Sequence, residues 1–325
     1  MTANDNAVAS RGREIIHNHG LWLTALLSVI VFLGLAAYTD LSDVKSALAA
    51  LNPETFGVVL GLTTVGYGFR FAKWHYYLRY LDVTVPIGAS MITFFSGLMM
   101  VITPGKAGEV WKAWFLRDKR GVPASKTTSV VGAERITDLI ALSAMAALGL
   151  VVYSRSSLPI LVILSIIAAG IGLLQWRRGC LAIFRRLESA PIIGEYATEL
   201  EQFYENAYRL FQFRPLAVST LFSLMAWGFE GVALWIVLES FGVEATVVIG
   251  LFVFGLGSVI GAVSMLPGGL AATEASMVGV LVTFGYPEAI AAAATIIIRV
   301  GTLWYAAVLG TAVFLTYKAT RSTKN

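Results

Sequence analysis

Apolar residues gather in eight long runs along the chain, and polar or charged stretches separate these runs. The runs occupy the segments 21–39, 55–72, 86–103, 128–153, 158–176, 215–240, 246–266 and 287–317. Several of them reach the roughly 20 apolar residues that a helix needs to cross the hydrocarbon core of a bilayer. The pattern therefore predicts an all-α polytopic membrane protein.

Two of these runs meet a Pro-Gly turn and then resume as a shorter apolar segment. The breaks lie at Pro104-Gly105 and Pro267-Gly268-Gly269, and the chain resumes at 107–117 and 271–284. Proline disfavours helix at the preceding residue, and glycine permits a sharp turn. Non-helical backbone at membrane depth persists only where protein covers it or where it lines a watery cavity. Each break therefore predicts a re-entrant hairpin that lies beside a cavity or at a crossing point buried by protein.

The basic residues favour six crossings plus two re-entrant hairpins over eight full crossings. Eight crossings would leave eleven basic residues outside and nine inside. With the two hairpins, eighteen of the 24 Lys and Arg residues face the cytoplasm, and only Lys45 and Arg155 face outside. Cytoplasmic loops are enriched in Lys and Arg. We therefore expect a multi-pass protein of the inner (cytoplasmic) membrane whose N-terminal segment 1–20 and tail 318–325 are both cytoplasmic.

The two halves of the chain resemble each other weakly. "GFRFAKW" from residue 68 aligns with "GFEGVALW" from residue 228, which puts Arg70 opposite Glu230. "TPGKAGE" from residue 103 aligns with "LPGGLAATE" from residue 266. Three crossings per repeat is an odd number, so the second repeat is inverted relative to the first. We expect repeats at 21–153 and 154–317, with an amphipathic cytoplasmic loop at 177–214. Inverted repeats with broken helices are typical of transporters.

Charged residues inside the expected spans are the candidate binding residues. A charge at the bilayer centre costs at least a few kcal/mol, so such a group usually faces the protein interior and has a function. Arg299 lies in the last span, and its possible partners across helices are Glu274, Glu109 and Glu230. The span at 128–153 carries Glu134, Arg135 and Asp138. A guanidinium suits a phosphate or carboxylate. The alternative for each arginine is a purely structural ion pair.

The short segments after the breaks offer further groups for an anion. Their N-terminal amides would point into the cavity, where the helix dipole favours negative charge. Lys106 adds a positive charge at the first segment, and Glu109 and Glu274 lie in the first turns. These carboxylates would either complement the helix dipoles or neutralise Arg135 and Arg299 while no anionic ligand is bound.

Composition and motifs exclude several other classes of site. Only 14% of the residues are charged, against roughly 25% in an average soluble domain. The single cysteine, Cys180, forms no internal disulfide, and the three histidines are scattered, so we expect no metal site and no cofactor. The basic residues lie beside apolar spans, which favours membrane anchoring over nucleic-acid binding. We find no phosphate-binding loop and no Ser-His-Asp arrangement in these 325 residues.

The motifs "TPGKAGEVWKAWFL…GAERITDLIAL" and "MLPGGLAATEASMVGVLV…IIIRVGTLW" resemble the flippase-like family formed by the transmembrane region of lysylphosphatidylglycerol synthase. The resemblance covers about residues 20–317. Ala272 stands where this family usually has glycine. Because no aminoacyl-transfer domain follows within this sequence, the resemblance implies a stand-alone member that handles or translocates a lipid. Its implied substrates are phospholipids or polyprenyl-phosphate-linked sugars.

These observations favour a lipid flippase or transporter that moves an anionic headgroup between leaflets without catalysis. Arg135 and Arg299 would hold the phosphate. Because no ATP-binding motif is present, a gradient of lipid or of an ion would drive the movement, or the movement would be passive. One alternative is a non-transporting membrane subunit that docks a glycosyltransferase or lipid-modifying enzyme through 177–214. Another is an enzyme that acts on lipid phosphates, for which the sequence supplies neither a nucleophile nor a metal cluster.

Overall fold

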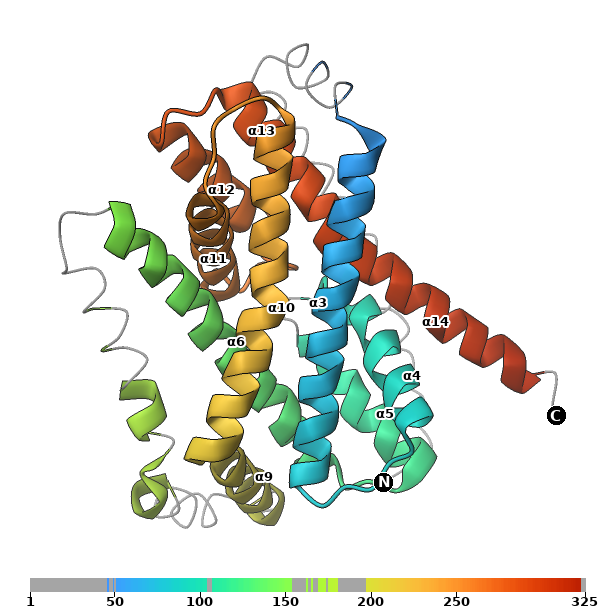
Figure 1. Ribbon diagram of the computed structural model, residues 1–325. Coiled ribbons are helices and arrows are strands. Elements are labelled where there is room, and N and C mark those ends of the chain that lie inside the picture. The colour runs from blue at the N-terminus through green and yellow to red at the C-terminus, as the bar shows by residue number, and fades with distance from the viewer. Residues whose placement is uncertain are drawn as a thin grey trace, which may run out of the picture.

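The computed structural model describes residues 51–103, 107–153 and 197–322, together with a few positions within 46–49 and 162–180. Within this part of the chain every regular element is a helix, as the apolar pattern predicts (Figure 1). Several predicted features lie outside the described residues: the expected crossing at 21–39, most of that at 158–176, the turn residues Pro104 and Gly105, and Lys106.

Four long helical segments form the frame of the molecule. They are α3 (Pro53–Tyr80), α6 (Ala124–Tyr153), α10 (Phe213–Ser240), and a continuous stretch of α13 (Glu288–Arg299), the π-helical turn Val300–Trp304 and α14 (Tyr305–Ser322). The segments Ala124–Tyr153, Phe213–Ser240 and Glu288–Thr320 are each long and apolar enough to cross a membrane. With 28 residues, α3 is about 42 Å long at 1.5 Å per residue.

Helices α3 and α10 lie side by side and antiparallel in the middle of the molecule (Figure 1). Tyr80, at the end of α3, bonds to Gln212 just before α10, while Gly66 lies against Ala226 further along. A Cβ at Gly66 would come within 2.9 Å of the Ala226 carbonyl oxygen. The two backbones approach this closely because a glycine occupies the crossing point.

Four short helices form two antiparallel pairs. The first pair consists of α4 (Ile87–Gly97) and α5 (Trp111–Arg120). The 3₁₀ turn Leu98–Met100 extends α4, and the 3₁₀ turn Ala107–Val110 precedes α5. The second pair is α11 (Val247–Val263) with α12 (Ala272–Thr283). In each pair a glycine of the first helix lies against a long side chain of the second: Gly97 against Lys112, and Gly257 against Met277.

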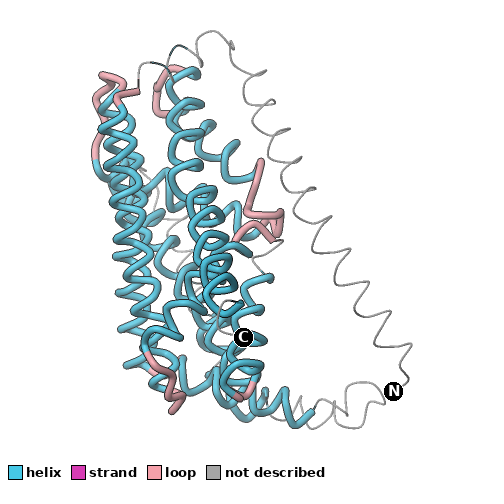
Figure 2. The backbone as a smooth tube through the Cα atoms, turned by 90° about the vertical axis from the view of Figure 1, so that its right-hand side faces the viewer, coloured by secondary structure: helices cyan, strands magenta, loops and turns pink. Residues whose placement is uncertain are grey.

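The two pairs occupy opposite ends of the molecule. Figure 1 shows α4 and α5 beside the lower half of α3, and α11 and α12 beside the upper half of α10. The first pair packs against α14, and the second packs against α6. In the view of Figure 2 the described helices gather in one elongated bundle, with loops at both ends and one loop partway along it.

The turn between α11 and α12 lies where the sequence puts its second break, but α11 ends at Val263 rather than at residue 266. Met265 adopts a φ of 55°, which an α-helix does not allow, so the helix stops before it. Gly268 and Gly269 have φ values of 60° and 68°. Glycine takes this left-handed conformation at little cost, and the chain can therefore reverse within a few residues.

The predicted loop 177–214 contains one described long helix, α9 (Ala197–Leu210). Its residues Tyr204, Ala207 and Leu210, spaced three apart, are buried. The Ser129 hydroxyl of α6 donates a hydrogen bond of 2.9 Å to the Phe203 carbonyl. The apolar face of this amphipathic helix therefore packs on the protein.

Candidate functional site

A cavity of about 240 Å³ lies where the long helices and the second helix pair meet. It is lined by residues of α3, α6, α10, α11, the turn before α12, and the α13–α14 stretch. Most of its lining is apolar. Three arginines nevertheless reach it from three different helices: Arg70 from α3, Arg135 from α6 and Arg299 from α13.

Arg299 is bound at the turn of the second helix pair. Its Nε donates to Oε1 of Glu274 at 2.6 Å, and its Nη2 donates to the Gly268 carbonyl at 2.7 Å. Glu274 lies in the first turn of α12 and is fully buried. Of the three partners that the sequence offered for Arg299, Glu274 is the one that binds it. The same contact ties the α11–α12 turn to α13.

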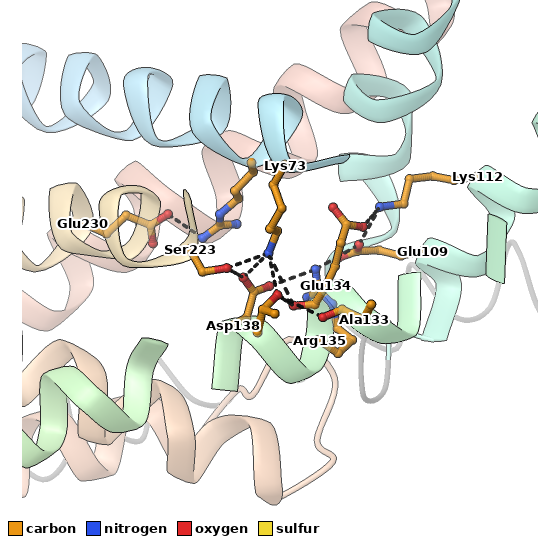
Figure 3. Close-up of polar contacts among 11 residues, drawn as sticks. Lys73, Glu109, Lys112, Ala133, Glu134, Arg135, Asp138, Ser223 and Glu230 are labelled. Carbon is orange, nitrogen blue, oxygen red and sulfur yellow. Dashed lines mark hydrogen bonds and ion pairs between the residues drawn. The ribbon is translucent and has the colours of Figure 1, made fainter. Parts of the chain in front are cut away.

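Arg135 occupies the equivalent place beside the first helix pair. Its Nη2 lies 3.3 Å from Glu109 Oε2 and 3.2 Å from Asp138 Oδ2. Its side chain is 27% exposed, while those of the two carboxylates are almost fully buried. Arg135 therefore lies at the edge of the cavity, with its guanidinium between two acids (Figure 3).

Lys112 joins Glu109 to Glu134. Its Nζ lies 3.1 Å from Glu109 and 2.8 Å from Glu134. The ammonium also lies 4.5 Å from the centre of the Trp74 ring, which is a cation–π geometry. Because the lysine is buried, its charge depends on these partners for compensation.

Lys73 binds Asp138, the same carboxylate that lies next to Arg135. Its Nζ lies 2.6 Å from Asp138 Oδ1 and donates to the Ser223 hydroxyl at 2.8 Å. Ser223 in turn donates to Asp138 Oδ1 at 3.0 Å. Figure 3 shows Lys73, Ser223 and Asp138 converging from three helices. This network joins α3, α6 and α10 beneath the cavity.

Arg70 binds Glu230 across the α3–α10 contact. Its Nη2 lies 2.8 Å from Glu230 Oε1, and its guanidinium carbon lies 3.7 Å from the centre of the Trp227 ring. A planar guanidinium stacks well on an aromatic face. The aromatic ring thus holds Arg70 in a fixed orientation at the cavity wall.

Within the described residues, the charges of this cluster balance. Five are basic and five are acidic: Arg70, Lys73, Lys112, Arg135 and Arg299 against Glu109, Glu134, Asp138, Glu230 and Glu274. The described part of the chain contains no group of three or more acidic, histidine or cysteine side chains that could hold a metal ion. The arrangement can exchange one ionic partner for another.

The sequence anticipated the acidic members and two of the arginines, but it did not identify Lys112, Arg70 and Lys73 as members. Arg70 and Lys73 were among the eighteen basic residues assigned to the cytoplasmic side, at the end of the apolar run 55–72. In the structure α3 continues to Tyr80, and both side chains are buried. Arg70, Lys73 and Tyr77 are spaced three and four apart, a helical periodicity that could have revealed this buried face. Glu230, which the sequence offered as a possible partner of Arg299, binds Arg70.

The chain belongs to the family described as the lysylphosphatidylglycerol synthase transmembrane region, which matches residues 22–310. It is also similar to several archaeal proteins named UPF0104 membrane proteins. One from Methanothermobacter thermautotrophicus is 28% identical over 229 residues, which cover 63% of this chain and 66% of that relative.

Two further relatives are similar along most of their length. A second UPF0104 membrane protein of the same organism is 22% identical over 305 residues, or 85% of this chain and 87% of the relative. One from Methanocaldococcus jannaschii is 22% identical over 309 residues, or 88% of this chain and 91% of the relative. Family membership and the apolar helices together make this a multi-pass membrane protein.

Proposed function

We propose that this member of the lysylphosphatidylglycerol synthase transmembrane family moves a lipid with an anionic, phosphate-bearing headgroup between the leaflets of the inner membrane. The headgroup enters the cavity, and Arg135 and Arg299 bind its phosphate. The tails stay in the bilayer, so only the headgroup needs a polar path. The substrate is a phospholipid or a polyprenyl-phosphate-linked sugar.

The observation that carries this proposal is the convergence of three arginines on one cavity of about 240 Å³. Guanidinium groups bind phosphate through paired hydrogen bonds. Buried charges at membrane depth are costly, and they usually line a substrate path. A purely structural ion pair would need no adjoining cavity, whereas a headgroup site requires one.

The acidic residues serve this function as replaceable partners. Glu109, Glu274 and Asp138 compensate the arginines while the cavity is empty. When a phosphate binds, it takes over part of that role. Glu134 and Glu230 hold Lys112 and Arg70 in place, so that the cavity keeps its shape during the exchange.

An inverted repeat supports alternating access to such a site. Helix α3 corresponds to α10, the pair α4–α5 to α11–α12, and α6 to the α13–α14 stretch. Packing between helices follows this correspondence, because α6 packs on α11 as α14 packs on α4. Glu109 binds Arg135 as Glu274 binds Arg299. The two helix pairs would then be re-entrant hairpins that enter from opposite membrane faces, beside six crossing helices with both termini cytoplasmic.

Lipid exchange by the purified protein in liposomes tests the proposal. Labelled phospholipid and labelled polyprenyl-phosphate sugar are followed between leaflets for the wild type, Arg135→Gln and Arg299→Gln. Exchange of one lipid class that both substitutions abolish in folded protein supports transport and identifies that class. Absence of exchange from well-folded wild type overturns the proposal and favours the subunit that docks a lipid-modifying enzyme or glycosyltransferase.

A further inference from the structure

The two halves of the site differ in one respect that bears on how charge is moved. Lys112 follows Glu109 by three residues, and Glu134 precedes Arg135, so that this lysine and this acid form a buried ion pair. The corresponding positions of the second half hold Met277, three residues after Glu274, and Ile298, before Arg299. Both are buried apolar residues. The second half therefore lacks the additional ion pair of the first.

Because of this difference, Glu109 has a second cationic partner besides its arginine, whereas Glu274 has none among the described residues. When Arg135 turns toward a ligand, Glu109 still has Lys112 at 3.1 Å. Among the described residues, Arg299 is the only ionic partner of Glu274. The second carboxylate oxygen of Glu274, Oε2, is buried and has no hydrogen-bond partner among them. If Arg299 leaves, Glu274 becomes an uncompensated buried charge, which is strongly unfavourable.

Among the described residues packed around Glu274, no other cation is placed to replace Arg299. Helix α11, packed against α12, has no ionisable side chain, and the turn 264–271 has none either. Helix α13 contributes Arg299 at its end and Glu288 at its beginning. Across the cavity lie Arg135 with Asp138 and Arg70 with Glu230, whose charges already compensate each other.

We propose that the protein moves its anionic lipid together with one proton, which Glu274 takes up when Arg299 transfers from Glu274 to the phosphate. The inference rests on the proposed lipid transport. The headgroup brings one negative charge into a cluster without net charge, and the proton from water, bonding to a carboxylate oxygen of Glu274, cancels it. The loaded site is then neutral, and its reorientation across the membrane moves no net charge.

The order of events follows from the packing. Glu274 is fully buried and does not line the cavity, whereas Arg299 does. A proton reaches the carboxylate only after Arg299 has turned toward the ligand. Proton uptake is therefore tied to the presence of the headgroup, which prevents a proton leak through the empty site.

The test uses the full-length protein in phosphatidylcholine liposomes with labelled phosphatidylglycerol, a monoanionic lipid, or labelled phosphatidylcholine, a zwitterionic control. Exchange is measured at about pH 6 and about pH 8, and separately under a potassium diffusion potential. Uptake of one proton per lipid predicts phosphatidylglycerol exchange up to about tenfold faster per pH unit of acidification. It also predicts that the potential leaves the final leaflet ratio unchanged.

Exchange without a proton has a different signature. Movement of one uncompensated charge would shift the leaflet ratio about 50-fold per 100 mV and would not depend on pH. That result overturns the proton coupling and leaves lipid transport intact. Absence of exchange for both phospholipids and for a labelled polyprenyl-phosphate sugar at any pH, from folded protein, overturns the transport proposal and the coupling with it.

Matched variants locate the proton. Glu274→Gln, which stands in for the protonated acid, is expected to make phosphatidylglycerol exchange independent of pH and responsive to the potential. Glu109→Gln, its counterpart, is expected to keep the wild-type pH dependence. Met277→Lys supplies the second half with the cation that the first half has, and it is expected to remove the pH dependence without altering Glu274. Unchanged pH dependence in Glu274→Gln would contradict the assignment.

Discussion

The ion pair between Lys112 and Glu134 gives a stability prediction that compares the two halves directly. Both side chains are 2% exposed, and their charged atoms lie 2.8 Å apart. Removal of one partner from a buried pair costs about 3–5 kcal/mol, because the other charge is left uncompensated, while replacement of both by apolar residues of similar size is often close to neutral. The second half already has the apolar version, Met277 and Ile298.

We therefore expect Lys112→Met and Glu134→Ile each to destabilise the protein by about 3–5 kcal/mol. The cost of Lys112→Met falls near the upper end, because this lysine also compensates Glu109. The double variant is expected to be within about 2 kcal/mol of the wild type, since Glu109 keeps Arg135 as its partner. The coupling energy of the double-mutant cycle should thus exceed about 3 kcal/mol.

Unfolding of the detergent-solubilised protein by increasing denaturing detergent measures these differences. Circular dichroism follows the helices, and the summed fluorescence of the eight tryptophans, one of which is Trp74 beside Lys112, follows the tertiary packing. Arg177→Gln serves as a control, because this arginine pairs with Glu205 at an exposed site where ion pairs contribute little. If the double variant is destabilised by the sum of the two single-variant costs, then Lys112 and Glu134 do not compensate each other. That result would refute the reasoning.

Three further predictions concern the backbone and the topology. Gly66→Leu should lower the thermal unfolding temperature markedly, because its Cβ would lie 2.9 Å from the Ala226 carbonyl oxygen; an unchanged temperature would contradict the close α3–α10 contact. Ala271→Gly should stabilise the protein by about 1 kcal/mol in chemical unfolding, since Ala271 has a φ of 68°; a loss of stability would show that its conformation is unstrained. A reporter tag inserted near Gly121 should be cytoplasmic and one near Phe284 periplasmic, and the same location for both would refute the inverted arrangement.

Much of the helix layout is present in the sequence because apolar runs and Pro-Gly breaks are local signals. The runs predicted at 128–153 and 215–240 correspond to α6 and α10 within a few residues. The end of α11 was missed by three residues because a positive φ at Met265 depends on the turn that follows, and no residue preference reveals it.

The composition of the site was only partly predictable. The similar spacing from each glutamate to its arginine, 26 residues in the first half and 25 in the second, pointed to Glu109 with Arg135 and Glu274 with Arg299. The partners of Lys73, Lys112 and Arg70 come from other helices and depend on how those helices pack. Charged residues along one face of a helix look like the end of a span when the sequence is read alone, so the charges of α3 were not recognised as buried.

The most direct test of the central claim is the rate of leaflet exchange for a labelled anionic lipid, measured with wild type, Arg299→Gln and the surface control Arg209→Gln in the same liposomes. Loss of a charge-assisted bond to phosphate is worth about 1.5–3 kcal/mol, or about 10- to 150-fold in rate. We predict that decrease for Arg299→Gln and wild-type exchange for Arg209→Gln. Equal rates for all three folded proteins would contradict a phosphate site at Arg299.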